Sequence, residues 1–177
     1  LILGELTREQ VMLGRFHEFF ESEGLPTDQV KVFNDEYQIR LGDKAFFCDH
    51  GDELVKQLKA TVKQYAVTNG TTVAQERKLR FSGLDQLLDG VFISEQVGVD
   101  KPQKAFFDAV WNEIGSYAPD EVVIVGDSLT SDIRGGKNAG ILTCWYNPDH
   151  LPNKIEVTPD CTIDNLQDIL SYLDESR

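Results

Sequence analysis

The hydrophobic pattern of the chain changes its character near residue 60. Before that point, residues 6–26, 27–42 and 52–61 read as three helices separated by polar breaks. The first helix has both ends marked, because Thr7 and Gln10 form a capping box and Gly24 supplies a stop signal. Its apolar face carries several phenylalanines, which we interpret as core residues, although such rings can also stack on a base: Phe16, Phe19 and Phe20.

From residue 64 onward, short apolar runs alternate with helical patterns. Strands are predicted at residues 64–70, 88–94, 121–127, 140–146 and 160–163, and helices at residues 72–83, 102–115 and 164–175. Pro102 is expected to open the second of these helices. Strands that alternate with helices predict an α/β fold, a Rossmann-like parallel sheet with helices on both faces. We therefore divide the chain into a partial helical domain, residues 1–47, and an α/β core, residues 48–177.

Composition narrows the functional classes. The chain has 177 residues and a net charge of −13, which argues against a binder of nucleic acid polymers. An anionic substrate would then need a local cation or a lysine. No apolar run reaches the length of a membrane span and no leader pattern is present, so we expect a cytoplasmic protein with reduced cysteines. The histidines have no metal-site spacing.

Polar residues follow three of the predicted strands, at the edge where ligands collect in open α/β sheets. They are Thr68, Asn69 and Gly70, then Lys101, and finally Asp127 with Asp132. Each has a structural alternative. Thr68 could cap the next helix, Lys101 could be a solvated lysine, and the two aspartates could be a turn residue and a helix cap.

Taken together, these residues predict a phosphate site. A hydroxyl and backbone N–H groups can hold phosphoryl oxygens, and an ammonium can neutralise their charge. Carboxylate oxygens suit Mg²⁺, which keeps several of its waters and bridges to phosphate. The set lacks a nucleophile.

The stretches "YAVTNG", "VGVDKPQKAFF" and "VVIVGDSLTSDIRGGKNAG" resemble motifs II, III and IV of the haloacid dehalogenase (HAD) superfamily, in order and at typical spacing. The resemblance extends to "TCWYNPD" and to the helical front, which is similar to a C1-type cap. It covers essentially the whole chain and is strongest to the pyrimidine-nucleotide 5′-nucleotidase branch.

The resemblance implies a role for each matching residue. Thr68, the backbone of Asn69 and Gly70 would bind the phosphoryl group, and Lys101 would neutralise it. Asp127 would ligate Mg²⁺ directly, and Asp132 would act through a metal-bound water or Lys101. Gly126 would let the turn come close, and Gly135 and Gly136 would let the following helix pack tightly.

One family feature has no counterpart in this sequence. Family members begin with a central strand that ends in D-x-D, whose first aspartate attacks phosphorus and whose second is the general acid/base. Without that strand, the strands at residues 64–70 and 121–127 would have unpaired inward edges. We expect roughly 50–60 upstream residues, one strand plus cap helices, to supply it; the alternative is that another polypeptide does so. The 177 residues alone are expected to be inactive.

The leading hypothesis is a Mg²⁺-dependent phosphatase that acts on nucleoside 5′-monophosphates, as a monomer or homodimer. A phosphoglycolate or sugar-phosphate phosphatase is the alternative within the family, because the cap selects the substrate. A metal-free dehalogenase is disfavoured by the two aspartates. A non-catalytic binding domain is the alternative from another class, and the complete set of Thr68, Lys101, Asp127 and Asp132 argues against it.

Overall fold

The alternation of strands and helices is present in the computed structural model, which describes residues 6–115 and 117–175. The helices are α1 (Arg8–Ser22), α2 (Val30–Gly42), α3 (Gly51–Leu58), α4 (Thr72–Ser82), α5 (Ser94–Val97), α6 (Lys104–Ile114), α7 (Arg134–Ala139) and α8 (Ile169–Glu175). The strands are β1 (Tyr65–Thr68), β2 (Gly90–Ile93), β3 (Val123–Gly126), β4 (Leu142–Tyr146) and β5 (Cys161–Ile163). Short 3₁₀ turns and one π-helical turn, Leu129–Ile133, complete the chain. No described helix is both long and apolar enough to cross a bilayer.

The five strands form two parallel sheets. β1 pairs with β2, and β3, β4 and β5 form a second sheet in that order. Among the described residues, β1 and β3 each have one strand partner and are not paired with each other. The expected α/β fold is therefore present, and the edges of β1 and β3 are unpaired as the sequence analysis predicted.

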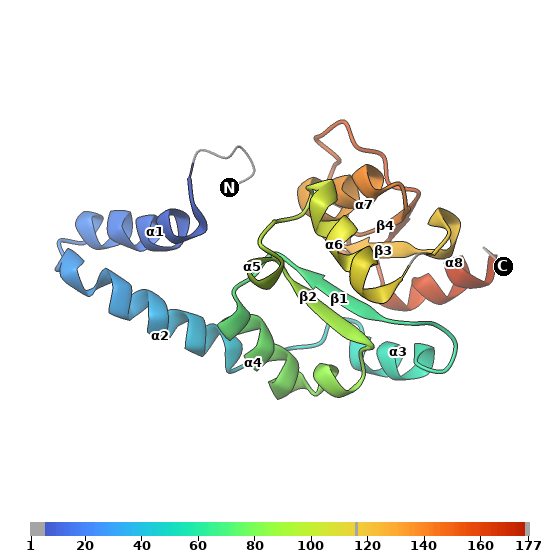
Figure 1. Cartoon of the computed structure of the whole chain (residues 1–177), viewed down its shortest axis with the longest axis horizontal. Coiled ribbons are helices and arrows are strands. Elements are labelled where there is room, and N and C mark those ends of the chain that lie inside the picture. Colours follow the sequence, from blue (N-terminus) through green and yellow to red (C-terminus); the bar gives the residue numbers. More distant parts are fainter. Residues whose placement is uncertain (1–5, 116, 176–177) are drawn as a thin grey trace.

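Two hydrophobic clusters hold the three-stranded sheet between helices. Figure 1 shows α6 and α7 on one side of this sheet and α8 on the other. On the first side, Phe106 and Phe107 of α6 pack with Ile124 of β3. On the other side, Leu54 of α3 packs with Cys144 of β4 and with β5 and α8. Burial of these apolar side chains stabilises the core.

The helices α1 and α2 form an arm on one side of the molecule (Figure 1), which we call the helical arm, residues 8–42. The capping box of Thr7 and Gln10 is present at the start of α1. α2 packs against α4 so closely that a Cβ at Gly42 would lie 2.5 Å from Arg77 Cβ. The boundary predicted at residue 47 stays a prediction.

The phenylalanines of α1 divide between core and surface. Phe20 is buried and contacts Phe33 edge-on, with 5.2 Å between ring centroids. Phe16 stacks edge-on against Phe33 and Tyr37 of α2, whereas Phe19 is exposed. The interpretation of this face as core therefore holds for part of it.

The prediction that Pro102 opens α6 is wrong. The helix begins at Lys104, and Pro102 lies in a turn after a cis peptide bond with Lys101. Both backbone polar groups of Lys101 are hydrogen-bonded to the side chain of Asn69, which holds the chain in the turn before the helix begins. Sequence patterns gave no sign of this long-range contact.

The cysteines are free, as expected. Cys144 and Cys161 are distant in sequence, but they face each other across β4 and β5, with 3.2 Å between their Sγ atoms. Burial, together with the Cys161 neighbour, raises the pKa of the Cys144 thiol, so this thiol stays protonated at neutral pH.

Candidate functional site

The predicted site residues lie where β1 and β3 end. Thr68 is the last residue of β1, and Asp127 directly follows β3. Lys101 lies in the turn between α5 and α6, and Asp132 lies in the π-helical turn after β3. This is the edge at which parallel sheets bind ligands.

Lys101 and Asp132 form a buried ion pair at the centre of the site. Lys101 Nζ lies 2.7 Å from Asp132 Oδ1, and the two side chains are 6% and 11% exposed. Lys101 Nζ also donates to the carbonyl of Val67 in β1 at 2.6 Å. The other Asp132 oxygen, Oδ2, accepts from the backbone N–H of Ser128 at 3.1 Å. The alternative of a solvated lysine is excluded, because Lys101 as a whole is 5% exposed.

Asn69 fixes the position of Lys101. Its Nδ2 donates to the Lys101 carbonyl and its Oδ1 accepts from the Lys101 N–H, each at 2.8 Å. Lys101 is therefore fixed at its backbone by Asn69 and at its ammonium by Asp132 and the Val67 carbonyl. The sequence analysis gave Asn69 a role through its backbone only and missed this contact of its side chain.

Thr68 does not cap the following helix. That cap is Thr71, whose Oγ1 accepts from Ala74 N at 3.4 Å. Within residues 6–115 and 117–175, no hydrogen bond involves the Thr68 hydroxyl, so it is free to bind a ligand. The carbonyl of Gly70, two residues on, accepts from Arg8 of the helical arm at 3.3 Å.

Asp127 is exposed, and its carboxylate has no partner in the part of the chain that the structure describes. Its backbone is fixed instead, because Trp145 Nε1 donates to the Asp127 carbonyl at 3.0 Å. Hard carboxylate oxygens are the donors that Mg²⁺ prefers. Among the described residues, no three His, Cys, Asp or Glu side chains lie together as a group that could hold a metal ion. The fit to Mg²⁺ therefore rests on the Asp127 carboxylate.

The glycines around the site allow close packing. A Cβ at Gly126 would lie 2.5 Å from the Asp132 carboxylate carbon, so a larger residue would displace the ion pair. A Cβ at Gly136 would lie 2.5 Å from Ile124 Cγ2 and 2.6 Å from Thr143 Cγ2. α7 therefore lies directly on β3 and β4, as the sequence analysis expected for this glycine pair.

A residue of the helical arm also reaches the site, and the sequence analysis did not identify it. Arg8 donates to the Gly70 carbonyl, to Ser94 Oγ at 2.8 Å, and to Asp100, the neighbour of Lys101. The sequence feature that could have drawn attention to Arg8 is its position directly after Thr7, the cap of α1. Arg8 ties the start of α1 to the two loops that carry Thr68 and Lys101.

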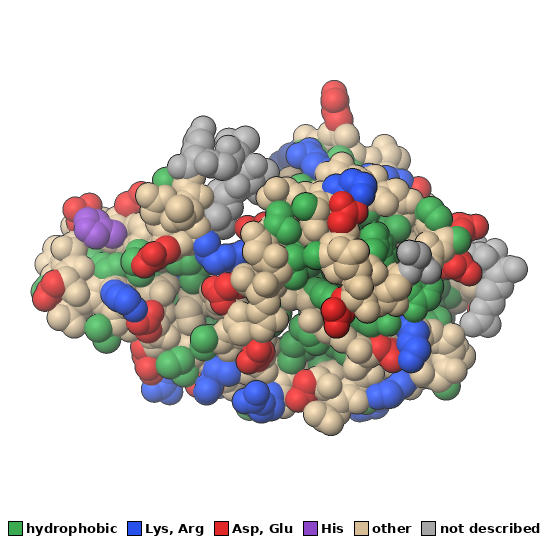
Figure 2. Space-filling model, in the orientation of Figure 1, with side chains coloured by type: hydrophobic (Ala, Val, Ile, Leu, Met, Phe, Trp, Pro, Cys, Tyr) green, Lys and Arg blue, Asp and Glu red, His purple; other side chains and the backbone are tan. Residues whose placement is uncertain are grey.

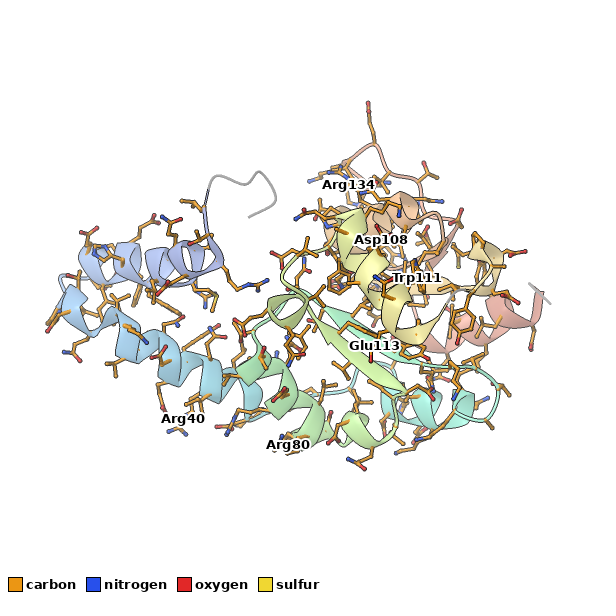
Figure 3. The ribbon with its side chains drawn as sticks, viewed as in Figure 1. Arg40, Arg80, Asp108, Trp111, Glu113 and Arg134 are labelled. Atoms are coloured by element: carbon orange, nitrogen blue, oxygen red, sulfur yellow. The ribbon has the colours of Figure 1, made fainter. Side chains whose placement is uncertain are left out.

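Two arginines, Arg40 and Arg80, lie away from this edge. Figure 3 shows the side chains of Arg40 on α2 and Arg80 on α4 extending outward from the molecule. Acidic and basic side chains are intermixed on the face visible in Figure 2, so the net charge of −13 is not gathered into one patch there. Positive charge near the strand ends comes from the buried Lys101 and from Arg8 of the helical arm.

Comparison with known proteins identifies relatives of the whole chain. A family model described as haloacid dehalogenase-like hydrolase matches residues 5–140. The HAD-hydrolase YfnB of Bacillus subtilis is 35% identical over 170 residues, which are 96% of this chain and 72% of YfnB. The pyrimidine 5′-nucleotidase PynA of Streptococcus pneumoniae is 34% identical over 177 residues, 99% of this chain and 74% of PynA. A crystal structure of YfnB bound to magnesium superimposes with a TM-score of 0.89 at 34% identity, covering 97% of this chain and 75% of that one.

Proposed function

Because the chain belongs to the haloacid dehalogenase-like hydrolases, we propose that it is the larger part of a magnesium-dependent phosphatase acting on pyrimidine nucleoside 5′-monophosphates. One observation carries the proposal: the buried ammonium of Lys101 is fixed at the end of β1, and two polar groups at the ends of β1 and β3, the Thr68 hydroxyl and the Asp127 carboxylate, lack partners in the described chain. A fixed cation next to free polar groups suits an anionic ligand.

Each residue has a definite task in this proposal. The Thr68 hydroxyl and the N–H groups of Asn69 and Gly70 bind phosphoryl oxygens. Lys101 neutralises the negative charge that the phosphoryl group brings to a protein with a net charge of −13. Asp132 keeps the ammonium in place, since it accepts its hydrogen bond at 2.7 Å.

Asp127 would hold Mg²⁺ in this proposal, and Asp132 would support the site through its contact with Lys101. When bound, the ion supplies a positive charge that stabilises the phosphoryl oxygens during transfer. The fit rests on the chemistry of the donors and on the free Asp127 carboxylate. The relative YfnB has been crystallised with magnesium.

The nucleophile is proposed to be an aspartate on a strand that lies outside this sequence and runs between β1 and β3. The unpaired edges of those two strands support this placement, because an edge inside a sheet leaves backbone groups without partners. The 177 residues alone are accordingly expected to release no phosphate.

The choice of substrate is supported by PynA, which is named a pyrimidine 5′-nucleotidase and is 34% identical over 177 residues. The test is phosphate release from dUMP, dTMP, ribose 5-phosphate and p-nitrophenyl phosphate by the full-length protein, with Mg²⁺ and with EDTA. We expect the highest kcat/KM for the pyrimidine nucleotides and no release with EDTA.

Two variants make this test specific. Asp127→Ala is expected to abolish release, whereas Glu113→Ala is expected to leave it unchanged, because Glu113 is an exposed acid on α6 (Figure 3). Release that persists in EDTA would contradict the metal requirement. A preference for ribose 5-phosphate would contradict the nucleotide assignment and leave the phosphatase proposal intact.

A further inference from the structure

Two cysteines on neighbouring strands, Cys144 of β4 and Cys161 of β5, form a pair of adjacent thiols. They are register partners in the parallel sheet, and both pack in the hydrophobic cluster that contains Leu54. Their side chains therefore leave the same face of the sheet, and their Sγ atoms are 3.2 Å apart. A disulfide bond is about 2.05 Å long, so the two sulfur atoms would have to approach by about 1 Å to form one.

The two thiols differ in what can reach them. Cys144 is fully buried, whereas Cys161 is partly exposed on β5, which has one strand partner among the described residues. The Cys144 thiol donates its hydrogen bond to Cys161 Sγ, and because burial raises the pKa of Cys144, this thiol keeps the proton that it donates. A thiolate at Cys161 is an acceptor for this bond, and the thiolate is the form of cysteine that reacts with oxidants. A small oxidant from solvent therefore meets Cys161 first.

The chemistry of this pair needs a peroxide as external oxidant. The Cys161 thiolate attacks one oxygen of hydrogen peroxide, the O–O bond breaks, and hydroxide leaves, so that Cys161 becomes a sulfenic acid. The Cys144 sulfur then attacks the Cys161 sulfur and the S–O bond breaks. The OH group leaves as water with the proton of the Cys144 thiol. Overall, two thiols are oxidised and one peroxide is reduced, which gives one disulfide and two water molecules.

Contacts on the two sides of Cys144 determine what moves when the sulfur atoms approach. On one side, the N–H and the hydroxyl of Thr143 both donate to Asp160 Oδ2, at 2.9 and 2.8 Å, and this fixes β4 to the start of β5. On the other side, Trp145 Nε1 donates to the Asp127 carbonyl at 3.0 Å. Because Trp145 directly follows Cys144, a displacement of Cys144 is transmitted to Trp145 and from there to Asp127.

We propose that Cys144 and Cys161 are an oxidation site, which a peroxide converts into a disulfide, and that this bond weakens Mg²⁺ binding at Asp127 by displacing Trp145. The role of Asp127 rests on the phosphatase function proposed above, and the oxidation site adds a means of regulating it. A reducing thiol reverses the change, because a disulfide is cleaved by thiol–disulfide exchange.

Peptide mapping tests the disulfide. Trypsin cleaves after Lys137 and Lys154, so the two cysteines fall on separate peptides, residues 138–154 and 155–177. The full-length protein is treated with hydrogen peroxide, its remaining thiols are blocked with iodoacetamide, and the digest is analysed by mass spectrometry. We expect the two peptides to be linked, and to separate in dithiothreitol. Absence of the linked peptide from the treated wild type would overturn the proposal.

Three cysteine variants make the mapping specific. Cys161→Ser and Cys144→Ala should each abolish the linked peptide. Cys48→Ser is the control and should keep it, because Cys48 is exposed and lies outside the pair. Circular dichroism checks that each variant is folded. A linked peptide that contains Cys48 in place of either partner would contradict the assignment.

Calorimetry with Mg²⁺ alone tests the effect on the site. Loss of a group that positions a metal ligand typically lowers metal affinity 10–100-fold, so the oxidised wild type should bind Mg²⁺ about tenfold more weakly than the reduced wild type. Peroxide-treated Cys161→Ser should bind as the reduced wild type does. Equal affinities of the linked and the reduced wild type would overturn the regulatory role. Neither measurement needs turnover, so a full-length protein that releases phosphate from no ester would refute the phosphatase function alone.

Discussion

The buried pair of Lys101 and Asp132 permits a strong prediction about stability. Replacing Lys101 with Met leaves the Asp132 carboxylate, 11% exposed, without its cation. Breaking a buried ion pair from one side costs about 3–5 kcal/mol, because the remaining charge is desolvated and uncompensated. Asp132→Leu is expected to cost a similar amount, since among the described residues it leaves the ammonium with only the Val67 carbonyl as an acceptor.

The double variant, Lys101→Met with Asp132→Leu, distinguishes a coupled pair from two independent residues. If the costs were additive, the loss would be about 6–10 kcal/mol, comparable to the whole stability of a typical domain, about 5–15 kcal/mol. Apolar replacement of both partners is often nearly neutral, and here the Ser128 N–H loses an acceptor, at about 1–3 kcal/mol. The double variant should therefore be more stable than either single variant.

Urea denaturation measures the free energy of unfolding for the four proteins of this double-mutant cycle: the wild type, the two single variants and the double variant. Trp145 is a suitable fluorescent reporter, because it lies on β4 and its Nε1 donates to the Asp127 carbonyl beside the pair. The pair of Lys56 and Asp52, 2.9 Å apart on α3 with side chains that are 57% and 30% exposed, provides a control cycle in which the coupling should be far smaller. A double variant less stable than both single variants would refute the reasoning.

Three further changes test particular contacts. Asn69→Ala removes both hydrogen bonds to the buried Lys101 backbone, so kcat of the full-length protein should fall about 10–100-fold and the free energy of unfolding in urea should fall by about 1–3 kcal/mol. Gly136→Ala places a Cβ 2.6 Å from Thr143 Cγ2, and despite the better helix propensity of alanine it should lower stability by about 1–3 kcal/mol in urea denaturation. Burial alone would raise the pKa of Asp160, but hydrogen bonds from Lys137 and Thr143 outweigh this effect and hold the pKa below 3.8. A carboxyl group whose pKa is lower in the folded than in the unfolded protein stabilises the fold above its unfolded pKa, and this contribution is lost as the pH falls. Asp160→Asn should therefore lower the free energy of unfolding at pH 7, and this difference from wild type should shrink below pH 3.8.

The element order was predictable because its signals are local. The capping box at Thr7 and Gln10 begins α1, and Gly24, with a φ of +66°, follows its end. The strands end in polar turns, and the strand and helix periods differ enough to be separated in a single sequence. The clustering of Lys101 with Asp132 was also within reach, because both follow strands of a parallel sheet.

The remaining features depend on contacts between distant segments. α2 has no apolar stripe, since Val32 and Phe33 are exposed while Asn34 and Gln38 are buried. An amide reads as a surface residue in any sequence pattern, so the buried face of α2 could not be predicted. Sequence analysis also missed the π-helical turn at Leu129–Ile133, from which Asp132 contacts Lys101.

The polar groups of the site fall into two sets: groups that are hydrogen-bonded to other parts of the protein, and groups that have no such partner among the described residues. Lys101, Asp132 and Asn69 are bound to one another or to the backbone, and these contacts fix their positions. The Thr68 hydroxyl and the Asp127 carboxylate have no partner within the described chain. The first group needs no ligand to be ordered, whereas the second gains partners when one binds.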